Sequence, residues 1–176
     1  LQEQDKLGEA IEAYTKALAL KPDYAQACNN MGSALKDQGK LDEAIASHTK
    51  ALALKPDHAS AHNNIGNALK DLGEIDSAIV LYEKTLANKP DFSEAFDNLV
   101  VVLNEFNDFR ITIKSYQKVI KANPKLPEAH HNLGLAFQTT GQNDKAIRSY
   151  KKAIHIKPDY AEAHNNIGIV FKELGQ

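Results

Sequence analysis

Five prolines stand 34 residues apart along the chain, and this fixed spacing is the feature that most restricts its fold. The segments around them are near-copies: Lys55–Gly66 reads KPDHASAHNNIG, Lys21–Gly32 reads KPDYAQACNNMG, and Lys157–Gly168 reads KPDYAEAHNNIG. The five prolines are Pro22, Pro56, Pro90, Pro124 and Pro158. A period of about 20 to 50 residues is typical of stacked repeats, in which each unit buries its apolar side against its neighbours. The spacing therefore predicts a repeat protein.

Each period carries two apolar stripes with helical spacing. In the unit from Ala59 to Phe92, Gly73 separates the stripes and Pro90 follows the second one. The first stripe consists of Ala61, Ile65, Ala68, Leu69 and Leu72, and the second of Ile75, Ala78, Ile79, Tyr82 and Leu86. The residue before a proline is disfavoured in the helical region, so the second helix has to end before Pro90. The pattern predicts an all-α chain of about ten helices, a first and a second helix in each repeat.

Small residues recur at matching places on both helices. Gly32, Gly66, Gly134 and Gly168 lie on the first helices, and Ala10, Ala44, Ala78 and Ala146 lie on the second ones. We expect them to face each other and to let the helix axes approach closely. The repeat from Ser93 departs from this pattern, with Val100 in the glycine column and Asn107 at the turn glycine. We expect Asn107 to adopt the left-handed conformation, which Asn tolerates better than most residues.

These columns resemble the tetratricopeptide repeat family over essentially the whole chain: the Leu/Ile-Gly pair, the alanines, the aromatic residue and the closing proline all match. The resemblance implies a right-handed superhelix, an α-solenoid of antiparallel helix pairs whose first helices line a concave groove. In that frame residues 1–176 form a single array. It consists of a truncated repeat (1–24), full repeats 25–58, 59–92, 93–126 and 127–160, and a further first helix (161–176).

One polar column is unbroken, and we call it the asparagine ladder: Asn30, Asn64, Asn98, Asn132 and Asn166. Asn is a mediocre helix former, so its recurrence in mid-helix requires a reason. A primary amide offers two donors and two acceptor lone pairs, and can pair with both the N–H and the C=O of an extended peptide. The ladder resembles the one in the superhelix of the O-GlcNAc transferases, which grips substrate peptides. The predicted peptide-binding residues are Asn29, Asn30, Asn63, Asn64, Asn67, Asn98, Asn132, Asn165 and Asn166. The alternative is that each Asn bonds an adjacent first helix and fixes the stacking.

Composition argues against several other functions. The net charge of −2 does not favour a nucleic-acid partner, which calls for a strongly basic face. The single Cys28 excludes an intramolecular disulfide, and the column of His62, His130 and His164 is spaced too widely for zinc. We find no catalytic motif and no apolar run long enough to span a membrane. The sequence therefore predicts no enzyme, no metal, no cofactor and no membrane insertion. No secretory signal is visible, but the chain starts in mid-repeat, so this absence does not decide the compartment; we expect a cytoplasmic location.

We interpret the chain as a protein-binding module that holds an extended peptide or protein segment in its groove. One alternative is a structural or self-assembly scaffold that uses its open ends and its convex face, because both ends lie within repeats and lack polar caps. A second alternative is the substrate-recruiting arm of a larger enzyme such as a glycosyltransferase, because we expect Leu1–Gln176 to be a segment of a longer array.

Overall fold

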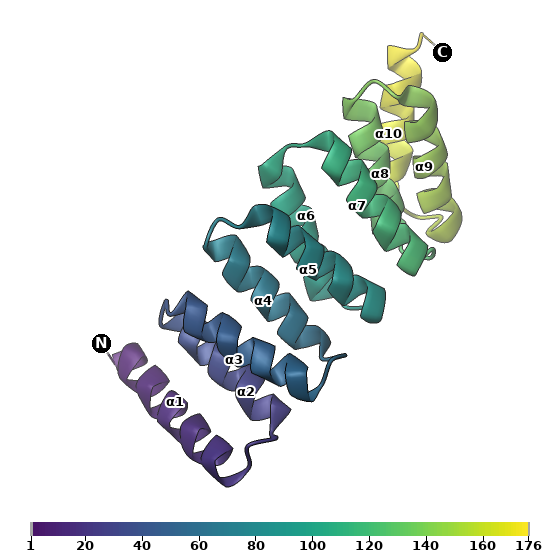
Figure 1. Cartoon of the computed structure of the whole chain (residues 1–176). Coiled ribbons are helices and arrows are strands. Elements are labelled where there is room, and N and C mark those ends of the chain that lie inside the picture. Colours follow the sequence, from purple (N-terminus) through teal and green to yellow (C-terminus); the bar gives the residue numbers. More distant parts are fainter. Residues whose placement is uncertain (1, 176) are drawn as a thin grey trace. The chain divides into compact units, whose positions relative to one another are not determined.

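The computed structural model describes residues 2–175, and the side chains of residues 6–175. Ten α-helices and no strand occur in this part of the chain (Figure 1), which confirms the predicted all-α class and helix number. The helices are α1 (Gln2–Leu20), α2 (Ala25–Asp37), α3 (Leu41–Leu54), α4 (Ala59–Asp71), α5 (Ile75–Asn88), α6 (Ser93–Phe106), α7 (Phe109–Ala122), α8 (Pro127–Thr139), α9 (Asn143–Ile156) and α10 (Ala161–Glu173).

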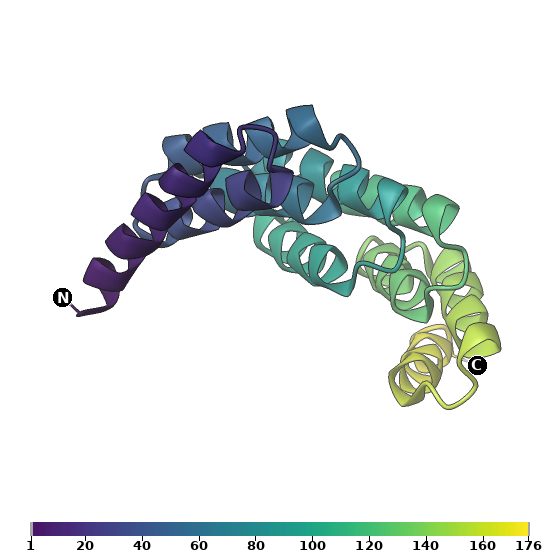
Figure 2. The same ribbon diagram turned by 90° about the horizontal axis from the view of Figure 1, so that it is seen from below.

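The chain divides into two compact units, Leu1–Val102 and Leu103–Gln176, which we call unit 1 and unit 2. Unit 1 holds α1 to α5 and most of α6, and unit 2 holds α7 to α10. Within each unit, helices pack mainly on the helix before and the helix after them, and α2 also contacts α4. Figure 2 is viewed from the side of α1, which lies in front of the other helices of unit 1. Local packing of this kind is typical of a repeat stack.

The turns explain where the helices begin and end. Each of α1, α3, α5, α7 and α9 ends two residues before a proline, as predicted. Between the two helices of a repeat, Gly39, Gly73 and Gly141 have positive φ angles. Asn107 takes the same place with a φ of 54°, which confirms the expected left-handed turn. The Asp108 side chain then caps α7 by accepting from the backbone N–H groups of Arg110 and Ile111 at 2.9 and 3.3 Å.

The glycine column of the first helices has a different partner from the one we expected. A Cβ built on Gly66 would lie 2.7 Å from Cε1 of Tyr82, and one on Gly134 would lie 2.5 Å from Cε1 of Tyr150. Gly32 is in the same relation to the His48 ring. The glycines therefore make room for an aromatic ring of the second helix, and alanine is not their nearest neighbour. The rings of Tyr82 and Tyr150 are fully buried there, and so contribute much apolar surface to the core.

Candidate functional site

The asparagine ladder lies on the first helices, and all five of its side chains are half-buried. The preceding residue in each repeat behaves differently. Asn29, Asn63 and His131 are buried, with Asn63 fully so, whereas Asp97 and Asn165 are exposed. In three of the five repeats the residue before the ladder Asn is therefore more deeply buried than the ladder Asn itself.

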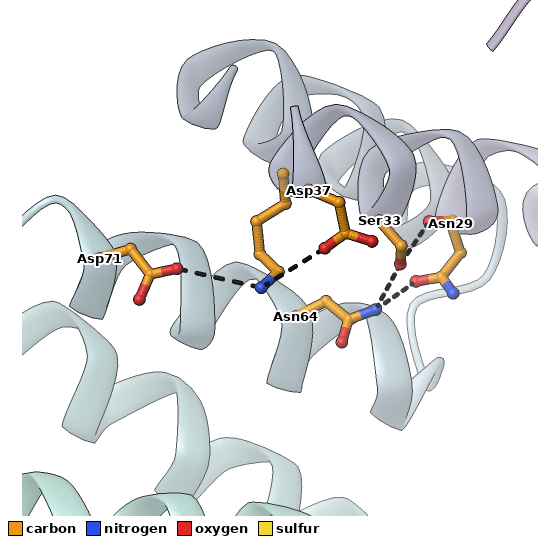
Figure 3. A network of polar contacts seen from close by, with 6 residues as sticks. Asn29, Ser33, Asp37, Asn64 and Asp71 are labelled. Carbon is orange, nitrogen blue, oxygen red and sulfur yellow. Dashed lines mark hydrogen bonds and ion pairs between the residues drawn. The ribbon is translucent and has the colours of Figure 1, made fainter. Parts of the chain in front are cut away.

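In unit 1 two ladder amides, those of Asn64 and Asn98, bond to the column before them, one repeat earlier. Nδ2 of Asn64 donates to Oδ1 of Asn29 at 3.3 Å and to Oγ of Ser33 at 3.4 Å (Figure 3). Nδ2 of Asn98 donates to Oδ1 of Asn63 at 3.1 Å. These bonds join α2 to α4 and α4 to α6. The stacking role that the sequence left open as an alternative is therefore present in this unit.

Asn63 holds a second contact at its other end. Its Nδ2 donates to Oε1 of Glu94 at 2.8 Å, so that one buried amide spans two residues of the next first helix. Asn29 also has two partners, but both contact its oxygen, because its Oδ1 lies 3.1 Å from Nδ1 of His48 on α3 as well as near Asn64. A buried amide with partners at both ends loses little on burial, whereas an unpaired one would be costly.

In unit 2 a ladder amide also bonds to the preceding column one repeat earlier, but the acceptor is a histidine. Nδ2 of Asn166 lies 2.9 Å from Nε2 of His131. Because Nδ2 can only donate, Nε2 is the acceptor and His131 is the neutral Nδ1–H tautomer. Burial lowers the pKa of His131, although its hydrogen bond to Asn132 and the carboxylates of Glu162 and Glu128 oppose this. His131 is therefore an uncharged acceptor at neutral pH.

In three of the ladder residues, Asn64, Asn98 and Asn166, part of the amide is not used by the fold. Among the described residues, no hydrogen bond reaches Oδ1 of Asn64, Asn98 or Asn166. Asn30 differs, because its Oδ1 accepts from Gln26 of the same helix at 2.8 Å. Because the amide is planar, a bond at Nδ2 also fixes the direction of Oδ1, which is the kind of pre-orientation that a binding group needs.

Charged and apolar side chains accompany the amides. In unit 1, Nζ of Lys36 lies 3.9 Å from carboxylate oxygens of both Asp37 and Asp71, and so links α2 to α4 (Figure 3). In unit 2, Leu135 and Ile169 are 39 % and 40 % exposed, each three residues after a ladder Asn. One turn separates such residues from the ladder on a helix face, so both units present mixed surfaces.

An open cavity of about 420 Å³ lies between α8 and α10. Its lining residues are His131, Ala161, Glu162, Asn165 and Asn166. The structure thus brings two of the predicted site residues together at one cavity. It also adds His131 and Glu162, which the sequence-based set did not include. His131 could have been included from the sequence, because it occupies the same column as Asn29 and Asn63.

Two other kinds of site receive no support in the described part of the chain. Among residues 6–175, no three His, Cys, Asp or Glu side chains are grouped so that they could hold a metal ion. No described helix combines the length and the apolar character needed to cross a bilayer.

Comparison with known proteins gives a consistent family assignment. The family pattern described as TPR repeat matches residues 2–39, 32–73, 112–141 and 139–175, and the one described as tetratricopeptide repeat matches residues 59–92. No curated protein matches the sequence.

Solved structures give the same picture. The crystal structure of MamA is 26 % identical, with 92 % of this chain and 94 % of that chain covered and a TM-score of 0.61. YrrB, described as a TPR protein with an unusual peptide-binding site, is 24 % identical, with 94 % and 85 % covered and a TM-score of 0.60. The Naa15/Naa10 complex bound to HypK-THB is 20 % identical, with 99 % of this chain and 28 % of that chain covered and a TM-score of 0.69. The last two show a shared fold alone.

Proposed function

This chain belongs to the tetratricopeptide repeat family, and we propose that it binds an extended peptide segment along the face of its first helices. Repeats of this family form protein–protein interaction modules. The observation that carries the proposal is the half-used ladder amide: Asn98 donates one N–H to Asn63 while its Oδ1 has no partner among the described residues. The same holds for Asn64 and Asn166.

The amide groups that the fold leaves unused can pair with a peptide backbone. After one N–H is used in stacking, the amide retains a second N–H and the oxygen. These two groups can accept from a backbone N–H and donate to a backbone C=O of the same extended segment. Packed first helices lie about 10 Å apart and an extended chain rises about 3.3 Å per residue, so successive amides would meet about every third residue. Such a grip is independent of the peptide's side chains.

The predicted site residues divide into two roles in this proposal. Asn64, Asn98, Asn132 and Asn166 contact the peptide directly, and Asn30, Asn67 and Asn165 add further polar groups at the same face. Asn63 is 0 % exposed and Asn29 is buried, so both act by holding the next ladder amide in place. In unit 2, the exposed Leu135 and Ile169 supply apolar contacts to side chains of the peptide.

The test is binding of fluorescent random-sequence peptides, measured by anisotropy, to the wild-type chain and to the triple variant Asn64→Ala, Asn98→Ala, Asn132→Ala. We expect the triple variant to lose binding. Peptides methylated on alternate backbone nitrogens should also bind more weakly than their unmethylated counterparts, because each methyl group removes a donor that the ladder needs.

The comparison variant is Asn63→Ala, which removes the acceptor that orients Asn98 and leaves all the ladder amides present. At temperatures where circular dichroism shows that it is folded, it should bind peptides more weakly than wild type but more tightly than the triple variant. If it loses binding as completely as the folded triple variant, or if methylation has no effect, the ladder serves stacking and the proposal is wrong.

A further inference from the structure

The second helices of unit 2 are rich in basic residues. Together α7 and α9 carry eight Lys or Arg side chains and one acidic side chain, that of Asp144. The basic residues of α7 are Arg110, Lys114, Lys118 and Lys121. Those of α9 are Lys145, Arg148, Lys151 and Lys152. All eight are exposed, and we call them the basic face. The corresponding helices of unit 1, α3 and α5, each carry one lysine and two acidic residues.

The repeat columns show which of these cations are specific to unit 2. One lysine column runs through every second helix: Lys16, Lys50, Lys84, Lys118 and Lys152. The columns beside it become basic in unit 2 alone. In the earlier second helices the column of Lys114 and Arg148 holds Glu12, Ala46 and Val80, and the column of Lys121 holds alanine three times. Because those helices form without cations at these positions, the repeat does not need them to fold.

The columns of the basic face point to solvent even within a stack of repeats. The helix α3 has α2 and α4 packed on it and repeats on both sides. Its residues in these columns are nevertheless exposed; they are Ala46, Thr49, Lys50 and Ala53. Val80 of α5 is 55 % exposed in the same register. The exposure of the basic face therefore follows from its place on the second helices, and repeats stacked on either side would not cover it.

The fold does little to neutralise this charge. Arg110 and Lys114, like Arg148 and Lys152, are four residues apart on one helix, a spacing at which like charges repel. Arg110 and Lys145 also lie in the first turns of their helices, where the helix dipole disfavours a cation. Arg110 has Asp108 at 3.7 Å, with its own side chain 95 % exposed. Within residues 6–175, no ion pair is formed by Lys114, Lys121, Arg148, Lys151 or Lys152. Cations that the fold neither needs nor neutralises indicate a partner that brings the opposite charge.

We propose that the basic face docks an acidic, extended protein segment. Residues four apart on a helix are separated by about 6 Å along its axis, and alternate side chains of an extended segment by about 6.6 Å. Asp or Glu at every second position can therefore pair with Arg110 and Lys114 on α7, and with Arg148 and Lys152 on α9. Each of these 14-residue helices is about 21 Å long, so about seven extended residues cover one of them.

The rest of the chain favours a short acidic segment over other polyanions. Of the 21 Lys and Arg residues, eight lie on α7 and α9, but of the 23 acidic residues only one does, so the remainder of the chain is strongly acidic. A long nucleic acid would extend beyond the basic face and be repelled there. No Phe or Tyr of these helices is exposed to stack on unpaired bases, and no large apolar side chain is exposed to enter a lipid surface.

The test is fluorescence anisotropy of a labelled peptide of alternating Glu and Ser, long enough to cover both helices. The basic-face variant is Lys114→Ala, Lys121→Ala, Arg148→Ala, Lys151→Thr. Each new residue is the one that α3 holds in the same column, so the variant should fold like wild type. It should bind the peptide about tenfold or more weakly, because it loses four exposed ion pairs that each contribute modestly. Added salt should weaken the binding of wild type.

The matched control removes four cations from unit 1: Lys16→Gln, Lys50→Gln, Lys55→Gln, Lys84→Gln. Its net charge equals that of the basic-face variant, and all four positions are exposed. If the charges of α7 and α9 hold the peptide, the control should bind within about a factor of two of wild type, because distant exposed charges are screened by salt. Circular dichroism shows that both variants are folded.

Several outcomes would overturn the proposal. They are a peptide that does not bind wild type, a peptide with Gln in place of Glu that binds equally well, and a basic-face variant that binds as tightly as the control. Oligouridylate, duplex DNA and vesicles containing phosphatidylserine are measured on the same proteins. If any of them binds more tightly than the acidic peptide and loses binding in the basic-face variant, the occupant is not a protein segment. The triple variant of Asn64, Asn98 and Asn132 should bind the acidic peptide like wild type, so failure of the groove proposal does not decide this one.

Discussion

Nδ2 of Asn98 donates to Oδ1 of Asn63 over 3.1 Å, and Asn63 lies 35 residues earlier in a fully buried position. Because Asn63 also donates to Glu94, its amide joins α4 to α6 through two bonds. A residue that interacts with the following repeat contributes to the interface free energy between neighbouring repeats. This interface energy holds a repeat stack together. Asn64 and Asn98 of the asparagine ladder thus take part in the stacking of the repeats.

Asn63→Ala is expected to lower the stability of the chain. The substitution leaves Nδ2 of Asn98 without its acceptor and Glu94 without its donor, at a cost of about 1–3 kcal/mol. Urea unfolding followed by circular dichroism measures this loss. Asn30→Ala is the matched control, because its bond to Gln26 stays within one exposed turn of α2, and its cost should be below about 0.5 kcal/mol. Equal losses in both variants would contradict a stacking role for Asn63.

Gly66→Ala is expected to destabilise unit 1 by about 1–3 kcal/mol, because the new Cβ would lie 2.7 Å from the buried Tyr82 ring. Gly168→Ala changes the same column without meeting any atom. It should be neutral or stabilise the monomer by about 0.5–1 kcal/mol, since alanine is the better helix former. Thermal melting at a concentration where the chain is monomeric compares the two. A destabilised Gly168→Ala variant would show that the space above Gly168 is not open.

The fold was largely predictable because each repeat has nearly the same residues at its turns and helix ends. The prolines fix where the second helices end, and the glycines with Asn107 fix the turns, so a single well-patterned unit determines the helices of the others. The partner of the glycine column was predicted wrongly. Periodicity shows that Gly66 and Ala78 both lie on packed faces, but it does not say which side chain reaches across. The ring of Tyr82 extends farther than an alanine methyl group and fills that space.

The candidate site was predictable only in part, for a related reason. Asn63 and Asn64 are adjacent and chemically identical, so the sequence placed both at the groove. The structure separates them, because neighbouring residues on a helix point about 100° apart, and the next first helix covers only one of them. Burial depends on that neighbour and not on the residue itself. Whether the half-buried amides bind a peptide stays a prediction.

Asn107 provides a test of the turn in the divergent repeat. Its φ of 54° is the conformation that glycine adopts in the other turns of this type. Asn107→Ala should cost about 1 kcal/mol, because a Cβ without a local hydrogen-bonding group is strained there. Asn107→Gly should be neutral or slightly stabilising. Chemical unfolding midpoints of the two variants against wild type measure the difference, and an alanine variant as stable as the glycine variant would contradict the reading.

His48 should make the stability of unit 1 sensitive to acid. Its ring is fully buried in the column that holds tyrosine elsewhere, and Nε2 has no partner in the described part of the chain. Burial, with smaller effects of His58 and Lys36, lowers its pKa from 6.5 to about 4. Above pH 6.5 the ring is neutral in both the folded and the unfolded chain. Between pH 6.5 and 4 only the unfolded chain takes up the proton, so stability falls as the pH falls.

The expected loss from His48 is about 2 kcal/mol between pH 7 and pH 5, obtained from the difference in proton binding between the two states. His48→Tyr should remove this part of the loss, because a tyrosine ring fits over Gly32 as Tyr82 fits over Gly66. Ser33 occupies the column of Asn67, which accepts from the Tyr82 hydroxyl, and so offers the new hydroxyl a partner. A weaker acid sensitivity should remain from His58, His62 and His131, whose pKa values are also lowered. Urea midpoints of both proteins at pH 7 and pH 5 measure the effect. If the variant loses as much stability as wild type, the folded chain does not keep His48 neutral.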